Sequence, residues 1–302
     1  MDKKVLDWLL ESPAWLKYAV ELQLLDKQPD VKPALEDKSI QKIITRLKDQ
    51  TAGLPAIKSG QVHYTATGKA YWDLFLLADI GLTLKDTGLE AEADDIFRFQ
   101  APDGTFTMPP NVRDIYWCMS AILISSIAKM GYRDDPRVIK YIRAALSDQI
   151  PGSGWDCDAY GYGPGYSCPM DDMNVLMLLG QYKDYRQNPK LNGAINHILG
   201  HWESGDSIYG FGVGTRFRSL QYPAVKYGIL RVLDALSLFP YAMEQPAFKN
   251  MLNFVHAKAK DGRYFAEMTD MVYTDFDFSQ TKEPSRWITF LVGRINKRVE
   301  GS

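Results

Sequence analysis

The sequence has little of several features that mark common protein classes. It holds 3 cysteines in 302 residues, and this small, odd number argues against a disulfide framework and for a reducing compartment. Its 35 Lys and Arg residues nearly balance its 37 Asp and Glu residues, so the net charge of -2 gives no basic surface for nucleic acid. The longest apolar run, near residues 119–127, is too short to span a bilayer, and the first residues show no secretory apolar stretch. We therefore expect a cytoplasmic protein with no nucleic-acid partner and no transmembrane segment.

Several chemical motifs are also missing. Gly161, Gly163 and Gly165 alternate with other residues and no basic residue follows them, so they do not form a phosphate-binding loop. Neither Asp94-Asp95 nor residues 275–277 (D-F-D) form the aspartate-rich motif that binds magnesium and diphosphate in class I terpene enzymes. The sequence also has no serine nucleophile elbow.

What the sequence does hold is helical periodicity along almost its whole length. Segments that are apolar throughout alternate with segments that are apolar on one face, and Gly, Pro or Asp residues stand between them. The aromatic content of 12% suits a large interior lined by rings. The pattern predicts helices at residues 3–10, 14–25, 37–49, 70–80, 89–100, 112–130, 137–149, 171–185, 190–202, 223–238, 245–258 and 285–298.

This alternation is an internal repeat. The turn aromatics Phe106, Trp155, Phe211 and Tyr264 follow one another at intervals of roughly 50 residues, which is typical of arrays of helix pairs. The apolar helices would form an inner layer and the amphipathic helices an outer layer. Inner helices would begin near residues 14, 70, 112, 171, 223 and 285, and the helix at 3–10 would close the ring beside the last of them. We therefore predict an all-α protein, with a single α/α toroid domain over residues 1–302.

Four segments resemble those of a known family. Residues 100–106 (Q-A-P-D-G-T-F) and 149–155 (Q-I-P-G-S-G-W) resemble the Gln–Trp turns of squalene cyclases and protein prenyltransferases. Residues 131–138 (G-Y-R-D-D-P-R-V) resemble the connector between inner and outer helices of these repeats. Residues 282–287 (K-E-P-S-R-W) resemble the start of the last helix in bacterial prenyltransferase/squalene-oxidase repeat proteins. The resemblance covers about residues 60 to 298 and implies an α/α toroid.

In a toroid of this kind, the first turns of the inner helices line one mouth of a central cavity. Aromatic walls with a few polar groups suit an apolar, isoprenoid-type ligand. The alternative is that these aromatic side chains simply fill the ring. The candidate ligand-binding residues are Tyr71, Trp72, Asp114, Tyr116, Trp117, Tyr222, Arg286 and Trp287.

Asp171 and Asp172 are the candidate catalytic residues. Residues 169–172 (P-M-D-D) resemble the Asp-any-Asp-Asp acid motif of class II terpene cyclases, with Pro169 in place of the first Asp. The resemblance gives Asp171 the role of proton donor to an alkene or epoxide, with Asp172 beside it. Such chemistry requires a carboxylic acid kept protonated in a dry pocket, where aromatic faces stabilise the cation. The alternative is that both carboxylates cap the start of a helix.

Cys157 and Cys168 are candidate zinc ligands, because zinc takes sulfur, nitrogen and oxygen donors and aspartates lie nearby. The spacing differs from the Asp, Cys and His set of protein prenyltransferases. In lanthionine cyclases a histidine directly follows the second cysteine, where this sequence has Pro169. His197 and His201 lie one turn apart on an expected outer helix, one face of which is solvated. The alternative is a pair of small buried thiols, which would imply no cofactor.

Two functions of different classes follow. The first is an isoprenoid-type enzyme, a cyclase or prenyltransferase relative, with Asp171 as general acid and an apolar small molecule as ligand. The second is a non-catalytic binding or scaffold toroid, or a toroid that acts on another ligand such as a carbohydrate, since paired carboxylates and aromatic platforms also suit glycosidic bonds. Squalene-type cyclases use two helical domains, whereas this length suits one. The residues give no oligomeric state.

Overall fold

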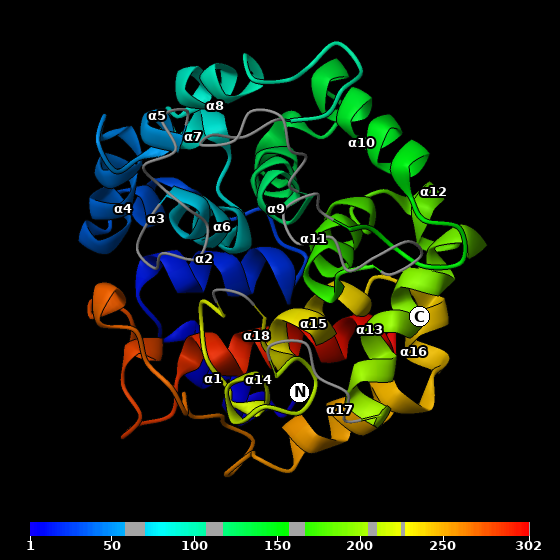
Figure 1. The fold of residues 1–302 in the computed structure, drawn as a ribbon. Coiled ribbons are helices and arrows are strands. Elements are labelled where there is room, and N and C mark those ends of the chain that lie inside the picture. The colour runs from blue at the N-terminus through cyan, green and yellow to red at the C-terminus, as the bar shows by residue number, and fades with distance from the viewer. Residues whose placement is uncertain (58–69, 107–116, 157–166, 205–209, 225–226, 302) are drawn as a thin grey trace. The chain divides into compact units, whose positions relative to one another are not determined.

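The computed structural model describes residues 1–57, 70–106, 117–156, 167–204, 210–224 and 227–301 (Figure 1). Within these residues the chain forms helices and no strand, apart from isolated antiparallel bridges that join Gln100 to Phe106 and Lys260 to Arg263 in turns. The prediction of an all-α protein is confirmed. No helix in these ranges is both long enough and apolar enough to cross a membrane.

The chain packs as two compact units. The terminal unit comprises Met1–Ile40 and Ile198–Ser302, and the central unit comprises Gln41–His197. Helices α4 (Lys38–Lys48) and α13 (Asn192–Ser204) each run from one unit into the other along the chain. The first forty residues therefore fold with the last hundred, while the residues between them form a continuous unit of their own.

The central unit is built around three helices that are buried along their length. These are α6 (Ala70–Ile80), α9 (Trp117–Ile127) and α11 (Pro169–Leu179). Helix α9 packs against both α6 and α11 and lies between them (Figure 1). The amphipathic helices α8 (Glu90–Phe97) and α10 (Pro136–Asp148) bury one face only. The two kinds of helix that periodicity predicts are thus present here. Shorter elements of this unit are α5 (Leu54–Ile57), α7 (Leu84–Thr87), η1 (Ala128–Tyr132), α12 (Lys183–Arg186) and η2 (Pro189–Leu191).

Two turns of the central unit are held by glutamine side chains in the same way. The amide Nε2 of Gln100 donates to the carbonyl oxygen of Arg137 at the start of α10, at 2.8 Å. The Nε2 of Gln149 donates to the carbonyl oxygen of Lys190 in η2, just before α13, also at 2.8 Å. Each amide also donates to the carbonyl four residues ahead in its own turn, at 3.1 and 3.0 Å. Each turn is therefore fixed to the start of the next amphipathic helix.

The terminal unit joins the two ends of the chain. Trp8 of α1 (Lys3–Leu10) lies 5.0 Å from the guanidinium carbon of Arg286, the first residue of α18 (Arg286–Glu300). Helix α2 (Ala14–Gln23) also packs against α18, and α18 packs against the buried helix α15 (Ile229–Leu236). Helix α1 thus contacts the start of α18, and the closed ring that the sequence predicts stays a prediction. The other elements are α3 (Lys32–Leu35), α14 (Thr215–Arg218), α16 (Pro240–Glu244), α17 (Pro246–His256), η3 (Met271–Tyr273) and η4 (Asp277–Ser279).

One predicted helix begins later than expected. Periodicity places its start at residue 223, but α15 begins at Ile229 and residues 219–224 are not helical. Gly228 precedes the helix in extended backbone, and a Cβ on it would lie 2.7 Å from the Cβ of Ala224. A glycine disfavours helix, and here it also allows close approach of the preceding segment. The helix predicted at 112–130 begins at Trp117 in the described residues.

Candidate functional site

Asp172 is the centre of a buried hydrogen-bond network at the start of α11. Its side chain is completely buried. Its Oδ1 accepts the backbone N–H of Trp155 at 2.7 Å, and its Oδ2 accepts the hydroxyl of Ser167 at 3.0 Å. The same Oδ2 lies 2.7 Å from Nδ1 of His197 on α13. Asp172 therefore joins the start of a buried helix to the turn before it and to the amphipathic helix after it.

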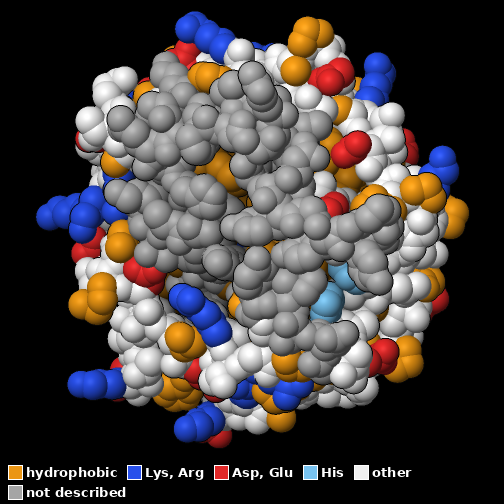
Figure 2. All heavy atoms as spheres, in the orientation of Figure 1, with side chains coloured by type: hydrophobic (Ala, Val, Ile, Leu, Met, Phe, Trp, Pro, Cys, Tyr) orange, Lys and Arg blue, Asp and Glu red, His pale blue; other side chains and the backbone are white. Residues whose placement is uncertain are grey.

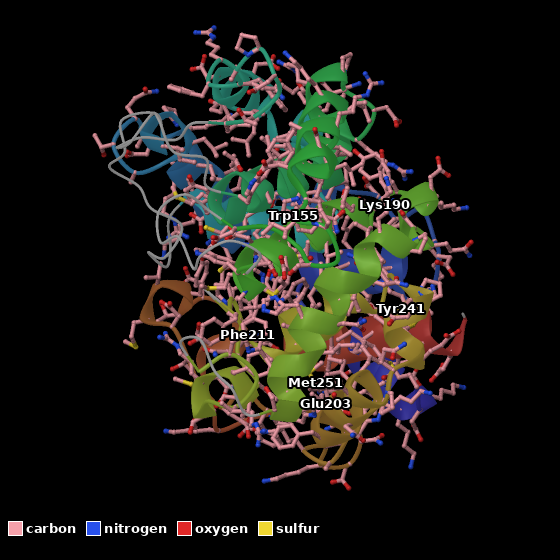
Figure 3. The ribbon with its side chains drawn as sticks, turned by 45° about the vertical axis from the view of Figure 1, so that its right-hand side comes forward. Trp155, Lys190, Glu203, Phe211, Tyr241 and Met251 are labelled. Carbon is pink, nitrogen blue, oxygen red and sulfur yellow. The ribbon has the colours of Figure 1, made fainter. Side chains whose placement is uncertain are left out.

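The turn that precedes α11 is itself anchored. The indole Nε1 of Trp155 donates to the carbonyl oxygen of Ala145 on α10, at 2.7 Å. Trp155 is completely buried, and Figure 3 labels it together with Lys190, whose carbonyl oxygen accepts from Gln149. Gly154 has no room for a side chain, because a Cβ would lie 1.7 Å from Oδ1 of Asp172. The backbone thus approaches the carboxylate as closely as a glycine permits.

The network extends from the buried carboxylate to the surface. The hydroxyl oxygens of Ser153 and Ser167 lie 2.7 Å apart, and Ser167 Oγ lies 2.8 Å from Nδ1 of His197. The side chain of His197 keeps 27% of its surface exposed. Figure 2 shows histidine side-chain atoms at the surface on this face of the molecule. Both Ser167 and Asp172 meet the same ring nitrogen, so these residues do not have the arrangement of a serine–histidine–aspartate triad, in which the serine meets the other nitrogen.

The contacts of Asp172 assign it a positioning role. Burial raises the pKa of Asp172, while the hydrogen bonds from His197, Trp155 and Ser167 act in the opposite direction. Its described partners lie in the turn and on α13, so it does not serve as the local helix cap that the sequence also allowed. Both carboxylate oxygens of Asp172 are thus hydrogen-bonded within the protein.

Asp171 is also completely buried, and its surroundings are different. Its charge contributes to the raised pKa of the Tyr141 hydroxyl, after burial of that hydroxyl itself, so the two groups are near neighbours. Tyr141 Oη lies 2.8 Å from Oγ of Ser120 on α9. Asn174 of α11 donates from Nδ2 to the carbonyl oxygen of Cys118 on α9, at 3.0 Å. Asp171 therefore belongs to a polar cluster where the first turns of α9 and α11 meet α10.

Three predicted ligand-binding residues stand at the starts of α6 and α9, and all three are completely buried. The indole of Trp117 donates from Nε1 to Oδ2 of Asp148 at 2.8 Å, which directs its ring towards α10. The ring of Trp72 packs edge-on to Phe75, with centroids 5.6 Å apart. The hydroxyl of Tyr71 is buried and has no hydrogen-bond partner in the part of the chain that the structure describes. The predicted residues Asp114 and Tyr116 lie outside the described residues.

Two other predicted residues pack together in the terminal unit. The rings of Tyr222 and Trp287 lie 5.3 Å apart, and Trp15 lies 5.3 Å from Trp287. Trp287 is fully buried among these rings. Arg286 instead points to α1, where it lies over Trp8 and 3.9 Å from a carboxylate oxygen of Glu11. Arg286 is thus directed away from the aromatic cluster that Trp287 joins.

The described residues do not contain a set of side chains that could hold the zinc ion expected from the sequence. Cys168 is buried at the start of α11, and Cys157 lies outside the described residues. Among the described residues, no three His, Cys, Asp or Glu side chains are grouped so as to hold a metal ion. The two histidines of α13 have different surroundings. His197 meets Asp172, whereas His201 is buried and its ring centroid lies 5.5 Å from that of Phe211.

Sequence reasoning missed His197, Ser167 and Ser153 as members of this site. Asp172 and His197 are 25 residues apart on different helices, and the amphipathic pattern of α13 does not show which partner its polar face meets. The local signal in the sequence is the glycine at position 154. The structure gives the reason for it, because a Cβ there would lie 1.7 Å from Oδ1 of Asp172. Comparison with models of known families, with curated proteins and with solved structures gives no match.

Proposed function

We propose that this chain is an α/α toroid of the terpenoid cyclase and protein prenyltransferase type that binds an apolar, isoprenoid-type ligand at the starts of its buried helices. Asp171 is the acid that protonates the ligand. The observation that carries the proposal is the complete burial of Asp171 at the start of α11, close to the buried hydroxyl of Tyr141. The adjacent Asp172 is held by Trp155, Ser167 and His197.

The chemistry needs an acid in a dry, aromatic environment. Protonation of an alkene produces a carbocation, which water would quench and aromatic faces stabilise. Asp171 is completely buried, and Tyr71, Trp72 and Trp117 stand at the starts of the neighbouring helices. The Asp172–His197 contact supports this arrangement, because it fixes the first turn of α11 and so the direction of Asp171.

The proposal predicts that Asp171→Asn abolishes product formation. We expect the wild-type protein to convert an isoprenoid such as squalene or geranylgeraniol to a cyclic product, and the variant to lose at least about 100-fold in rate, as for the removal of a general acid. Gas chromatography with mass spectrometry measures the product, and circular dichroism shows that the variant is folded. Asp94→Asn, at a carboxylate that is half exposed on α8, is the control and should keep full activity.

Packing of the aromatic residues favours a second candidate, a toroid that binds a ligand or partner without catalysis. Trp117 is bonded to Asp148 and Trp287 is packed among other rings, so neither presents an open wall. The same assay separates the two functions. If the wild-type protein binds the isoprenoid but forms no product, and Asp171→Asn binds it equally well, the binding function is supported and the enzymatic one is wrong.

A further inference from the structure

Tyr71 is a buried side chain whose hydroxyl forms no hydrogen bond with the residues that the structure describes. The residue has no exposed surface. Two other buried tyrosines of the central unit are satisfied: Tyr141 meets Ser120 at 2.8 Å, and Tyr182 donates to the carbonyl oxygen of Arg133 at 2.6 Å. A buried hydroxyl without a partner destabilises a fold by about 1–3 kcal/mol, and native structures rarely keep one.

The place of this hydroxyl connects it with the candidate acid. Tyr71 is in the first turn of α6, which packs against α9, and α9 packs against α11. Its pKa is raised first by burial and then by the nearby thiol of Cys118 in the first turn of α9. Cys118 and Asp171 both act on the hydroxyl of Tyr141. The Tyr71 hydroxyl and Asp171 therefore belong to one buried cluster at the starts of three adjacent helices.

We propose that the Tyr71 hydroxyl binds the oxygen atom of the ligand, so that the ligand is an uncharged, largely hydrocarbon molecule with one alcohol or carbonyl oxygen. This inference rests on the proposed function and narrows its ligand class. Tyr71 offers one O–H donor, which a single oxygen acceptor satisfies. In the same turn, the carboxylate of Asp73 is already paired with the guanidinium of Arg46, at 2.5 and 2.6 Å. Among the described residues of this turn, the charges of Asp73 and Arg46 are thus already paired with each other, and an uncharged oxygen acceptor matches the hydroxyl of Tyr71.

The first test concerns the protein without ligand. Tyr71→Phe removes a hydroxyl that has no hydrogen-bond partner in the described residues, so its urea midpoint should equal or exceed that of the wild type. Tyr182→Phe is the matched control. Tyr182 follows the C-terminal end of α11 and its hydroxyl donates to the carbonyl oxygen of Arg133, so its loss should lower the urea midpoint. An equal fall in both variants would show that the Tyr71 hydroxyl already has a partner such as water, and would overturn the inference.

The second test uses farnesol and farnesene, which share a hydrocarbon chain and differ in the hydroxyl. Titration followed by tryptophan fluorescence should show that the wild type binds farnesol more tightly than farnesene. Tyr71→Phe should lower the affinity for farnesol by about ten-fold and leave farnesene unchanged, while Tyr182→Phe should change neither. If both compounds bind and Tyr71→Phe keeps their ratio, the inference is wrong and the proposed function stands. If neither compound binds the wild type, both are wrong.

Discussion

Replacing Gly154 with alanine should lower the free energy of unfolding by about 3 kcal/mol or more, because the new methyl group overlaps Asp172. A Cβ at this position would lie 1.7 Å from Oδ1 and 2.3 Å from the carboxylate carbon of Asp172. The carboxylate cannot move aside without giving up its bonds to Trp155, Ser167 and His197. Urea unfolding followed by circular dichroism measures the loss.

Gly200→Ala provides the control for this substitution. Gly200 lies on α13, and a Cβ there would meet nothing within 4 Å. Alanine favours a helix over glycine by up to about 1 kcal/mol, so this variant should be as stable as the wild type or more stable. A Gly154→Ala protein with the wild-type midpoint would show that the turn and the carboxylate are not in contact.

Replacing Asp172 with alanine should lower the free energy of unfolding by about 3–5 kcal/mol, as for the loss of one member of a buried charged network. The backbone N–H of the buried residue Trp155 and the hydroxyl of Ser167 lose their acceptor, and His197 loses its partner. Asp94→Ala is the control, because Asp94 pairs with Arg137 at a half-exposed site, and such pairs contribute at most about 1 kcal/mol. Equal small losses in the two variants would contradict the prediction.

The double variant tests whether the two large effects have the same cause. Once Asp172 is alanine, the carboxylate that Gly154→Ala would strike is gone. The second substitution should then lower stability by less than about 1 kcal/mol, so the two effects should fail to add. Additive losses would show that Gly154 matters for a reason other than its approach to Asp172.

Asp172 should also make stability depend on pH. Burial raises its pKa above the ordinary value of 3.8, so the folded protein holds this proton more tightly than the unfolded chain does. Its contribution is fully present below pH 3.8 and is lost as the pH rises through the raised pKa. Relative to Asp172→Asn, the wild type should therefore lose stability over this range. Urea midpoints of both proteins between about pH 4 and 8 measure the difference, and a constant difference would contradict the expectation.

Local patterns in the sequence predict much of the helical structure. An apolar run that stops at Gly81 ends α6 at Ile80, as predicted. The two aspartates of this helix are paired with Arg46 and Lys129. Helix α11 ends earlier than its pattern indicates, because Gly180 stands at its C-terminus. The end of a helix depends on a single residue that interrupts it. Hydrophobic periodicity is measured over many residues and does not locate that residue.

The site could be predicted only in part, because its geometry depends on contacts between distant residues. Helical periodicity and residue type place Asp171 and Tyr71 in the first turns of buried helices. They cannot show that Asp172 meets His197, or that the Tyr71 hydroxyl has no partner among the described residues, since both facts depend on how α6, α11 and α13 pack. The sequence pattern also predicts a single domain and does not show the division into two compact units.

The terminal unit imposes an order on the folding of the chain during synthesis. Arg294 of α18 donates from Nη1 to Oε1 of Gln23, at the end of α2, at 3.0 Å and across 271 residues of sequence. At about 5–20 residues per second, a ribosome needs on the order of 10–50 s to make the chain between them. The apolar faces of the first helices therefore stay exposed until the end of the chain has been made. The central unit is continuous in sequence and can fold before that. Until α18 has been synthesised, Trp15 therefore lacks the ring of Trp287 that packs against it in the folded protein.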